Sequence, residues 1–247
     1  MVAAHARSVY SDDMNTTDGA ALGMSFPARE WGVTSAAVPA RLIAAPRVGA
    51  AEALRDFEQG GRFVGITKGQ FSLVDILRAL LDKTGPADVT ICAWTSGIRD
   101  VESAAWLLRT GRIQRLRWFI DRSFVTRQPK YASEVRRLFG DDSLVESNTH
   151  AKLLLISNDD WKVTVRSSMN LNCNRRLEQF DVDDSADIHE FFSAMLDEIA
   201  EKMGPGFRKP CETVDAVFDQ VEFAWAPSAP PAEWRPREGP TEWVPDR

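Results

Sequence analysis

Short apolar stretches alternate with amphipathic ones through the middle of this 247-residue chain. Compact apolar runs bounded by turn residues predict strands, whereas apolar residues three or four positions apart predict helices. The predicted strands are Phe63–Ile66, Val89–Trp94, Leu116–Ile120, Leu144–Val145, Lys152–Ile156, Lys162–Ser167 and Glu178–Val182. One predicted helix begins after Ser72, and three others cover Val101–Leu108, Tyr131–Phe139 and Ile188–Met203. This alternation predicts an α/β domain with a mixed, largely parallel sheet flanked by helices.

The helix after Ser72 shows the clearest boundaries. Ser72 is a capping residue, and Asp75 three positions later completes a short form of the capping box. Gly85-Pro86 ends the helix. The glycines of Gly65 to Gly69 have the wrong spacing for a phosphate-binding loop, so we interpret this stretch as a strand-to-helix turn.

The pattern divides the chain into three parts. Residues 1–58 lack sustained periodicity, apart from a short helical stretch near their end, and are predicted to form an irregular N-terminal arm. Residues 59–209 form the α/β domain. Residues 210–247 are rich in proline and carry Trp225, Trp234 and Trp243, which indicates an extended tail rather than a second domain. These tryptophans could dock on a protein partner or on the chain's own surface.

Composition narrows the class of protein. Hydrophobic residues make up 44% and charged residues 27%, as in ordinary globular proteins. No apolar run reaches membrane-spanning length, and the N-terminus lacks a secretory leader pattern, so we expect a cytoplasmic protein without membrane contact. The three cysteines are widely spaced and match neither a disulfide framework nor a zinc pattern. We therefore expect no metal and no cofactor.

The net charge of −6 hides a basic stretch between Arg99 and Arg137, where ten basic side chains stand against four acidic ones. A surface of this kind attracts phosphates. The alternative is an ordinary solvated helical surface. The nucleic-acid-binding candidates in this stretch are Arg112, Arg115, Arg117, Arg122 and Arg127.

The chemistry concentrates in His150-Ala-Lys152 and in Ser167-Ser168-Met-Asn170, two segments that the predicted strand pair brings together. Residues two apart on a strand share a face, so each segment presents two side chains on one side. Histidine can attack phosphorus or donate a proton, while lysine and asparagine hold the non-bridging oxygens. The set is suited to phosphoryl transfer.

These two segments resemble the HKD signature of the phospholipase D superfamily, H-x-K-x4-D-x6-G-S-x-N. Ser167 stands where the signature has glycine, and fourteen residues rather than eleven separate Lys152 from Ser167. Ser157 occupies the position expected for the aspartate when counted forward. When the positions are counted backward from Ser167, Asp160 occupies the aspartate position. A hairpin longer by three residues would therefore fit the signature at both its His-x-Lys end and its Ser-x-Asn end.

The resemblance covers roughly residues 60 to 203 and implies roles for further residues. Asn174 and Glu178 look like the Asn/Glu pair that often follows the signature, in which the glutamate orients the histidine. By this resemblance His150 is nucleophile or general acid, Lys152 and Asn170 bind phosphate, and Ser168 assists. The supporting residues are Asp160, Ser167 and Asn174.

The family's reaction needs two histidines, and this chain carries one copy of the motif. Neither His5 nor His189 stands in a comparable pattern. The resemblance therefore implies a homodimer that brings two copies of His150 together, and two-fold pairing is the commonest oligomer geometry.

The leading hypothesis is a metal-independent phosphodiesterase that acts on nucleic acid as a homodimeric nuclease. Lipid hydrolysis is less attractive, because the sequence shows no amphipathic membrane helix or apolar lid. The main alternative is an inactive phospholipase D-like module that binds nucleic acid or protein. Others are a scaffold that recruits a partner through its tail, and a His150 that is merely structural.

Overall fold

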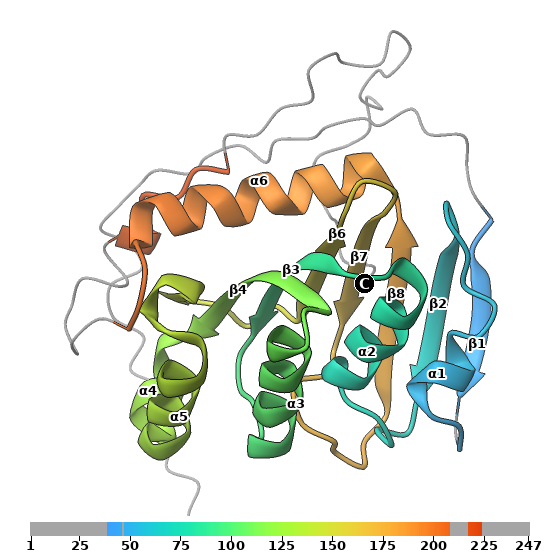
Figure 1. The fold of residues 1–247 in the computed structure, drawn as a ribbon, viewed down its shortest axis with the longest axis horizontal. Coiled ribbons are helices and arrows are strands. Elements are labelled where there is room, and N and C mark those ends of the chain that lie inside the picture. The colour runs from blue at the N-terminus through green and yellow to red at the C-terminus, as the bar shows by residue number, and fades with distance from the viewer. Residues whose placement is uncertain (1–38, 46, 208–216, 224–247) are drawn as a thin grey trace, which may run out of the picture.

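One twisted sheet of eight strands organises the computed structural model, which describes residues 39–45, 47–207 and 217–223 (Figure 1). The strands lie in the order β1-β2-β8-β7-β6-β3-β4-β5. Their bounds are β1 Arg41–Ala45, β2 Arg62–Thr67, β3 Ala87–Ala93, β4 Ile113–Asp121, β5 Leu144–Ser147, β6 Leu153–Ser157, β7 Lys162–Ser167 and β8 Glu178–Asp184. Every predicted strand is present, with ends that differ by a few residues.

The sheet is mixed, which confirms the predicted α/β class. Three of the seven neighbouring pairs are parallel (β1 with β2, β3 with β4, β4 with β5) and four are antiparallel. Six strands nevertheless share one direction, because β6 and β8 alone among the eight run the other way. Parallel pairing is thus less extensive than expected, since the segment from β6 to β8 folds back on itself in the centre of the sheet.

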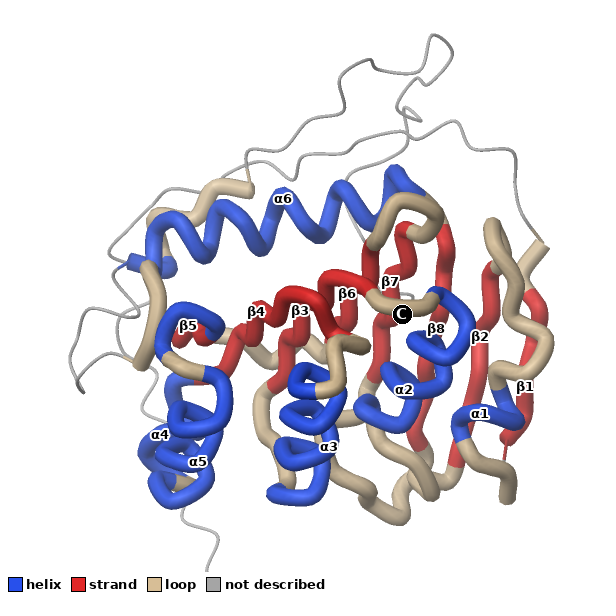
Figure 2. The backbone as a smooth tube through the Cα atoms, viewed as in Figure 1, coloured by secondary structure: helices blue, strands red, loops and turns tan. Residues whose placement is uncertain are grey.

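Helices cover both faces of the sheet (Figures 1 and 2). Their bounds are α1 Ala50–Ala53, α2 Leu73–Thr84, α3 Ile98–Arg109, α4 Arg122–Arg127, α5 Pro129–Phe139 and α6 Ala186–Met203. Helices α1 to α5 lie on one face, and α6 crosses the other. Of these, α4 is a short helix that the periodicity did not predict.

Strand alternation divides the apolar residues between two cores. Ile91 of β3 points to the large core under α2 and α3, whereas Cys92 points to the smaller core under α6. Helix α6 contributes Leu196, Ile199 and Met203 to the smaller core. Because both faces of the central strands are covered, their sequences are nearly continuous apolar runs.

The folded domain begins earlier than the predicted boundary at residue 59. Strand β1 pairs in parallel with β2, and α1 packs beside α2, so both belong to the domain rather than to an irregular arm. Leu54 and Phe57 are fully buried. Residues 1–38 of the predicted arm lie outside the described residues.

A short part of the predicted tail also packs on the domain. Val217, Phe218 and Val221 pack against the core under α6. The Lys202 side chain donates to the Gln220 carbonyl, and the Glu222 N–H donates to Glu198 at 2.6 Å. The tryptophan-bearing remainder of the tail, residues 224–247, lies outside the described residues.

The capping box predicted at α2 is present in full. The Ser72 hydroxyl accepts from the Asp75 N–H at 3.4 Å, and the Asp75 carboxylate accepts from the Ser72 N–H at 2.8 Å. The Ser72 hydroxyl also donates to Asp100 at 3.0 Å, which links the starts of α2 and α3. Burial raises the pKa of Asp100 to about 6; the Ser72 hydrogen bond opposes this shift and the charge of Asp75 adds to it.

Replacing Asp100 by asparagine should stabilise the fold at neutral pH. The folded state binds the Asp100 proton more tightly than the unfolded chain, so stability falls as the pH rises from about 4 to 6 and stays lower above it. Asp100→Asn keeps the oxygen that accepts from Ser72 and removes this penalty. We expect the free energy of unfolding in urea to rise by about 1–2 kcal/mol at pH 7, after allowance for partial exposure, and by much less at pH 4.5.

Glu102→Gln, at an exposed position of α3, serves as the control and should change the unfolding free energy little. An Asp100→Asn protein no more stable than wild type at pH 7 would contradict the burial argument.

Candidate phosphoryl-transfer site

The candidate residues gather at one edge of the sheet. Strands β3, β4, β5 and β7 end at this edge, and β6 and β8 begin there because they run in the opposite direction. The two motif segments face each other across the β6–β7 hairpin, where the Ser167 N–H donates to the Lys152 carbonyl at 3.0 Å. The predicted convergence of the two segments is therefore present.

His150 and Lys152 contact each other directly. The Lys152 Nζ lies 2.9 Å from Nδ1 and 3.3 Å from Nε2 of the His150 ring, and it donates to the His150 carbonyl at 2.5 Å. Both residues precede β6, in an irregular segment rather than in the strand. Strand alternation was thus the wrong reason for their proximity, because the lysine side chain folds back onto its neighbour.

The Lys152 ammonium is held in a confined place. The residue is 7% exposed, whereas His150 is exposed. Burial lowers the pKa of Lys152; the negative charges of Glu178 and Asp121 act in the opposite direction. Burial also raises the pKa of Cys92 to about 11, and its thiol is paired with the Thr149 hydroxyl at 3.1 Å. Cys92 is therefore a neutral wall of the site rather than a nucleophile.

Ser168 and Glu178 form the opposite side of the site. The Ser168 hydroxyl donates to the Glu178 carboxylate and accepts from the Gln179 N–H at 3.0 Å. Glu178 therefore binds the motif serine, and no hydrogen bond from it to His150 is present among the described residues. Ser167 supports the turn, since its hydroxyl donates to the Gln179 carbonyl at 2.8 Å and accepts from the Met169 N–H at 2.9 Å.

Asn170 leaves a hydrogen-bonding position unfilled. Its Oδ1 is buried and lacks a partner within the described residues. The next residue, Leu171, anchors the segment to the end of β3: its N–H donates to the Thr95 carbonyl at 3.3 Å and its carbonyl accepts from the Gly97 N–H at 2.6 Å. Because buried polar atoms are normally paired, the unpaired Oδ1 makes the Asn170 amide a candidate for a functional contact.

Asn174 lies in a loop whose path is determined by Gly69. Gly69 has a φ of +71°, and a Cβ there would stand 1.5 Å from the Asn174 carbonyl oxygen, so only glycine fits. The Asn174 side chain donates to Asn172 at 3.2 Å. The strand-to-helix turn predicted around Gly69 thus supports the loop after the motif.

Asp160 lies away from the site. It sits in the turn between β6 and β7, at the end of the hairpin opposite Lys152. With five residues in β6, the separation along the strand is roughly 16 Å. Since Ser167 still bonds to Lys152 at the site end of the hairpin, the longer hairpin leaves the convergence of the two segments intact.

The five candidate arginines do not form one surface. Arg112 pairs with Asp82 at 2.5 Å, Arg115 pairs with Asp88, and Arg117 pairs with Asp197 at 2.5 Å. Arg112 and Arg115 lie at the start of β4, away from the site, which corrects the prediction of a continuous basic face. Arg122 and Arg127 follow the end of β4 and are at the same edge as His150.

Sequence reasoning missed two residues that contact this edge. Trp94 follows β3, and its ring lies 5.4 Å from the His150 ring, centroid to centroid, with Arg127 stacked on it at 3.9 Å. Asp121 ends β4 and accepts from the Thr149 N–H at 3.1 Å. Trp94 is the last residue of one predicted strand and Asp121 directly follows another; these positions were the available signal, because the carboxyl ends of parallel strands form sites.

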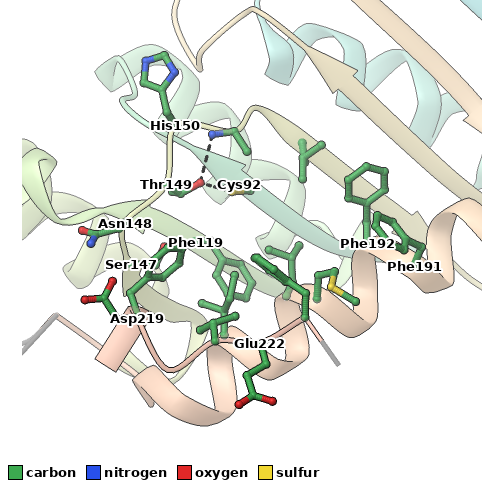
Figure 3. Close-up of a pocket in the computed structure, with 18 residues that line it drawn as sticks. Cys92, Phe119, Ser147, Asn148, Thr149, His150, Phe191, Phe192, Asp219 and Glu222 are labelled. Carbon is green, nitrogen blue, oxygen red and sulfur yellow. Dashed lines mark hydrogen bonds between the residues drawn. The ribbon is translucent and has the colours of Figure 1, made fainter. Parts of the chain in front are cut away.

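An apolar cavity of about 770 Å³ opens beside His150, between the sheet and α6 (Figure 3). His150 and Asn148 lie at its rim, and Phe119, Phe191 and Phe192 contribute apolar walls. Residues of the 217–223 segment complete it. The polar residues at the edge of the sheet therefore lie next to an apolar cavity.

His189 is remote from this edge. It lies on α6 and borders a second cavity together with Arg115 and Arg117. Burial lowers its pKa to about 4, so the ring is neutral at physiological pH. Within the described residues, no group of three or more His, Cys, Asp or Glu side chains is arranged to hold a metal ion. In the same part of the chain, no helix has the length and apolar character needed to cross a membrane.

Comparisons with known proteins find likeness in structure and none in sequence. No protein-family profile and no curated protein sequence matches the chain. Polyphosphate kinase from Porphyromonas gingivalis is similar over 68% of this chain, with a TM-score of 0.47 and 12% identity; the match spans 30% of the kinase. Nuc, a phospholipase D family member from Salmonella typhimurium, is similar over 59% of this chain and 95% of its own (TM-score 0.40, 13% identity).

A third similar structure is the archaeal chromatin protein TrmBL2, described as having a novel mode of DNA binding (TM-score 0.38, 10% identity, 62% of this chain and 55% of that one). Likenesses of this size concern the course of the chain alone. The candidate site therefore depends on the residues described above.

Phosphate binding should depend on Lys152 and weaken at alkaline pH. The pKa of Lys152 is lowered, so the ammonium loses its proton below the ordinary lysine value near 10.5. Inorganic phosphate binding, measured by calorimetry, should fall as the pH rises through that pKa. Lys152→Met should weaken binding about tenfold or more at pH 7.5, because one charge-assisted hydrogen bond is lost.

The arginine of Lys152→Arg stays charged over the whole pH range, so its phosphate binding should not weaken at alkaline pH. Equal phosphate affinity of Lys152→Met and wild type would remove Lys152 from the phosphate site.

Proposed function

We propose that this protein is a metal-independent phosphodiesterase of the phospholipase D type, acting through a phosphohistidine on His150 in a site completed by a second copy of the chain. The contact between the buried Lys152 ammonium and the exposed His150 ring is the observation that supports this most. It would bring a nucleophile and a phosphate-binding cation to one point, beside a segment that carries Ser168 and Asn170.

In the proposed first step, a ring nitrogen of His150 attacks phosphorus. A P–N bond forms, the P–O bond to the leaving alcohol breaks, and His150 of the second copy donates a proton to the leaving oxygen. In the second step, that same histidine accepts a proton from water, which attacks phosphorus and breaks the P–N bond. Atoms and protons balance without a cofactor.

The surrounding groups would stabilise the charge that develops on phosphate. The Lys152 ammonium contacts the His150 ring, and an incoming phosphate oxygen would attract it away and expose the ring nitrogen. A half-turn of the Asn170 amide would put its NH₂ group at the position of the unpartnered Oδ1, where it can donate to the same phosphate. Glu178 would fix Ser168 at the opposite side.

Nucleic acid is the substrate class that we propose first. Arg127 at the edge of the site would contact a backbone phosphate, and Arg122 lies on the same short helix, α4. Arg112, Arg115 and Arg117 are paired with aspartates. So few basic side chains at the site imply that the protein contacts only a short stretch of the nucleic-acid strand. We therefore expect weak dependence of binding on salt compared with proteins that cover a long stretch of duplex.

The apolar cavity favours a second candidate, a phosphodiester that carries an apolar group. The cavity that has His150 at its rim is lined by Phe191 and Phe192, and about 770 Å³ is enough for such a group. A third outcome is an inactive module that binds phosphate-bearing ligands without turnover.

The test is hydrolysis in EDTA of a single-stranded oligonucleotide and, separately, of phospholipid vesicles. Wild type should cleave the oligonucleotide, and His150→Ala should lose at least about 10³-fold in rate because the nucleophile is gone. His5→Ala should behave as wild type. Cleavage of vesicles alone would select the apolar substrate.

Mixing wild type with excess His150→Ala tests the two-copy site. A mixed dimer holds a single copy of His150, so the activity per wild-type chain should fall toward zero as the mutant is added. Equal cleavage by wild type and His150→Ala would show a contaminating activity and refute the proposal. Binding of the oligonucleotide without cleavage would select the inactive module.

A further inference from the structure

Five residues form, together with His150, a closed ring of contacts that the resemblance to the HKD signature does not include. They are Trp94, Asp121, Ser123, Arg127 and Thr149, and we name them the Trp94 ring. It comes from three consecutive sheet connections, after β3, after β4 and after β5. Since the segments are far apart in sequence, their closure around one histidine requires an explanation.

The polar half of the ring holds the backbone before His150. Asp121 accepts from the Thr149 N–H at 3.1 Å through Oδ2 and from the Ser123 N–H at 2.9 Å through Oδ1. The Thr149 hydroxyl then accepts from the Ala151 N–H at 3.2 Å. The backbone N–H groups of the two residues that flank His150 thus bond to one carboxylate and one hydroxyl.

The aromatic half holds the His150 ring. Trp94 lies against it with a centroid distance of 5.4 Å and an angle of 53° between the rings. On Trp94 itself, the Arg127 guanidinium stacks with Cζ 3.9 Å from the ring centroid. This cation–π geometry lies well within the distance at which the interaction is favourable. The Arg127 Nε also donates to the Ser123 hydroxyl at 3.1 Å, which closes the ring of contacts.

We propose that Trp94 is a positioning residue of the site: in contact with both the Arg127 guanidinium and the His150 ring, it fixes the direction of the nucleophile and, at the same time, a cation for the phosphate. This inference rests on the proposed phosphoryl-transfer function. Arg127 uses Nε for Ser123 and a π-face for Trp94, which leaves its Nη atoms to bind a ligand. Lysine could not replace it, because an ammonium lacks the planar stacking group.

The positioning role predicts different kinetic effects for two variants. Trp94→Ala frees both the His150 ring and Arg127, so hydrolysis should lose about 10- to 100-fold in kcat, with a raised KM. Arg127→Met keeps the Trp94–His150 contact and should raise KM about tenfold while leaving kcat within about threefold. Trp94→Phe retains an aromatic ring for both contacts and should restore most of the kcat.

A spectroscopic measurement separates this inference from the proposed function. The Trp94 ring current shifts the ring-proton resonances of His150, which the His150→Ala spectrum identifies. In Trp94→Ala these resonances should move toward the values of an exposed histidine, and in Trp94→Phe they should move less. The control is Trp106→Ala, because Trp106 is 44% exposed on α3 and is not a member of the Trp94 ring.

The outcomes are distinct. If wild type neither hydrolyses phosphodiesters nor binds inorganic phosphate, the proposed function fails, and the His150 resonances still decide whether Trp94 holds the ring. Unmoved His150 resonances in Trp94→Ala would overturn the positioning role. So would a Trp94→Ala protein that keeps wild-type kcat and KM in an active enzyme.

Discussion

Strands β6 and β7 pair in register from Leu153 with Arg166 to Ser157 with Lys162, and the pairing continues as a hydrogen bond from the Ser167 N–H to the Lys152 carbonyl. Everything at the candidate site depends on this register. A slip of one residue would turn every side chain of the hairpin to the other face and separate the two motif segments. The apolar residues of β6 prevent such a slip, because Leu154 and Ile156 are needed in the large core. Packing of the core thus determines the chemistry at the edge.

The site also shows how a charge can be kept in a poorly hydrated place. Lys152 is nearly buried, and Asp121 and Glu178 supply the negative charge that offsets part of its loss of hydration. Each of these carboxylates also makes a structural hydrogen bond, since Asp121 binds the Thr149 N–H and Glu178 binds Ser168. A single set of acidic groups therefore positions both motif segments and stabilises the cation between them.

Local patterns in the sequence were enough to predict the α/β class, the strands β2 to β8 and the capping box of α2, because each depends on neighbours in the chain. The features that the sequence did not predict depend on contacts between residues that are far apart in the chain. Strand β1 is short and largely exposed, so its pattern is weak, and it exists because β2 offers it a partner. Arg112, Arg115 and Arg117 form ion pairs with aspartates of α2, β3 and α6, and no local pattern in the sequence predicts these partners. The apolar pattern predicts Trp94 only as the last residue of a strand, and its place beside His150 requires the order of the strands in the sheet.

The central claim is that His150 carries the phosphoryl group during turnover. Mass spectrometry of the protein, quenched in alkali during hydrolysis of an oligonucleotide in EDTA, tests this most directly, since phosphohistidine survives such conditions whereas a bound ester would be released on denaturation. The account predicts a phosphoryl or nucleotidyl adduct on the peptide that contains His150, absent from the His150→Ala protein. Turnover without an adduct on that peptide, or with the adduct on another residue, would contradict it.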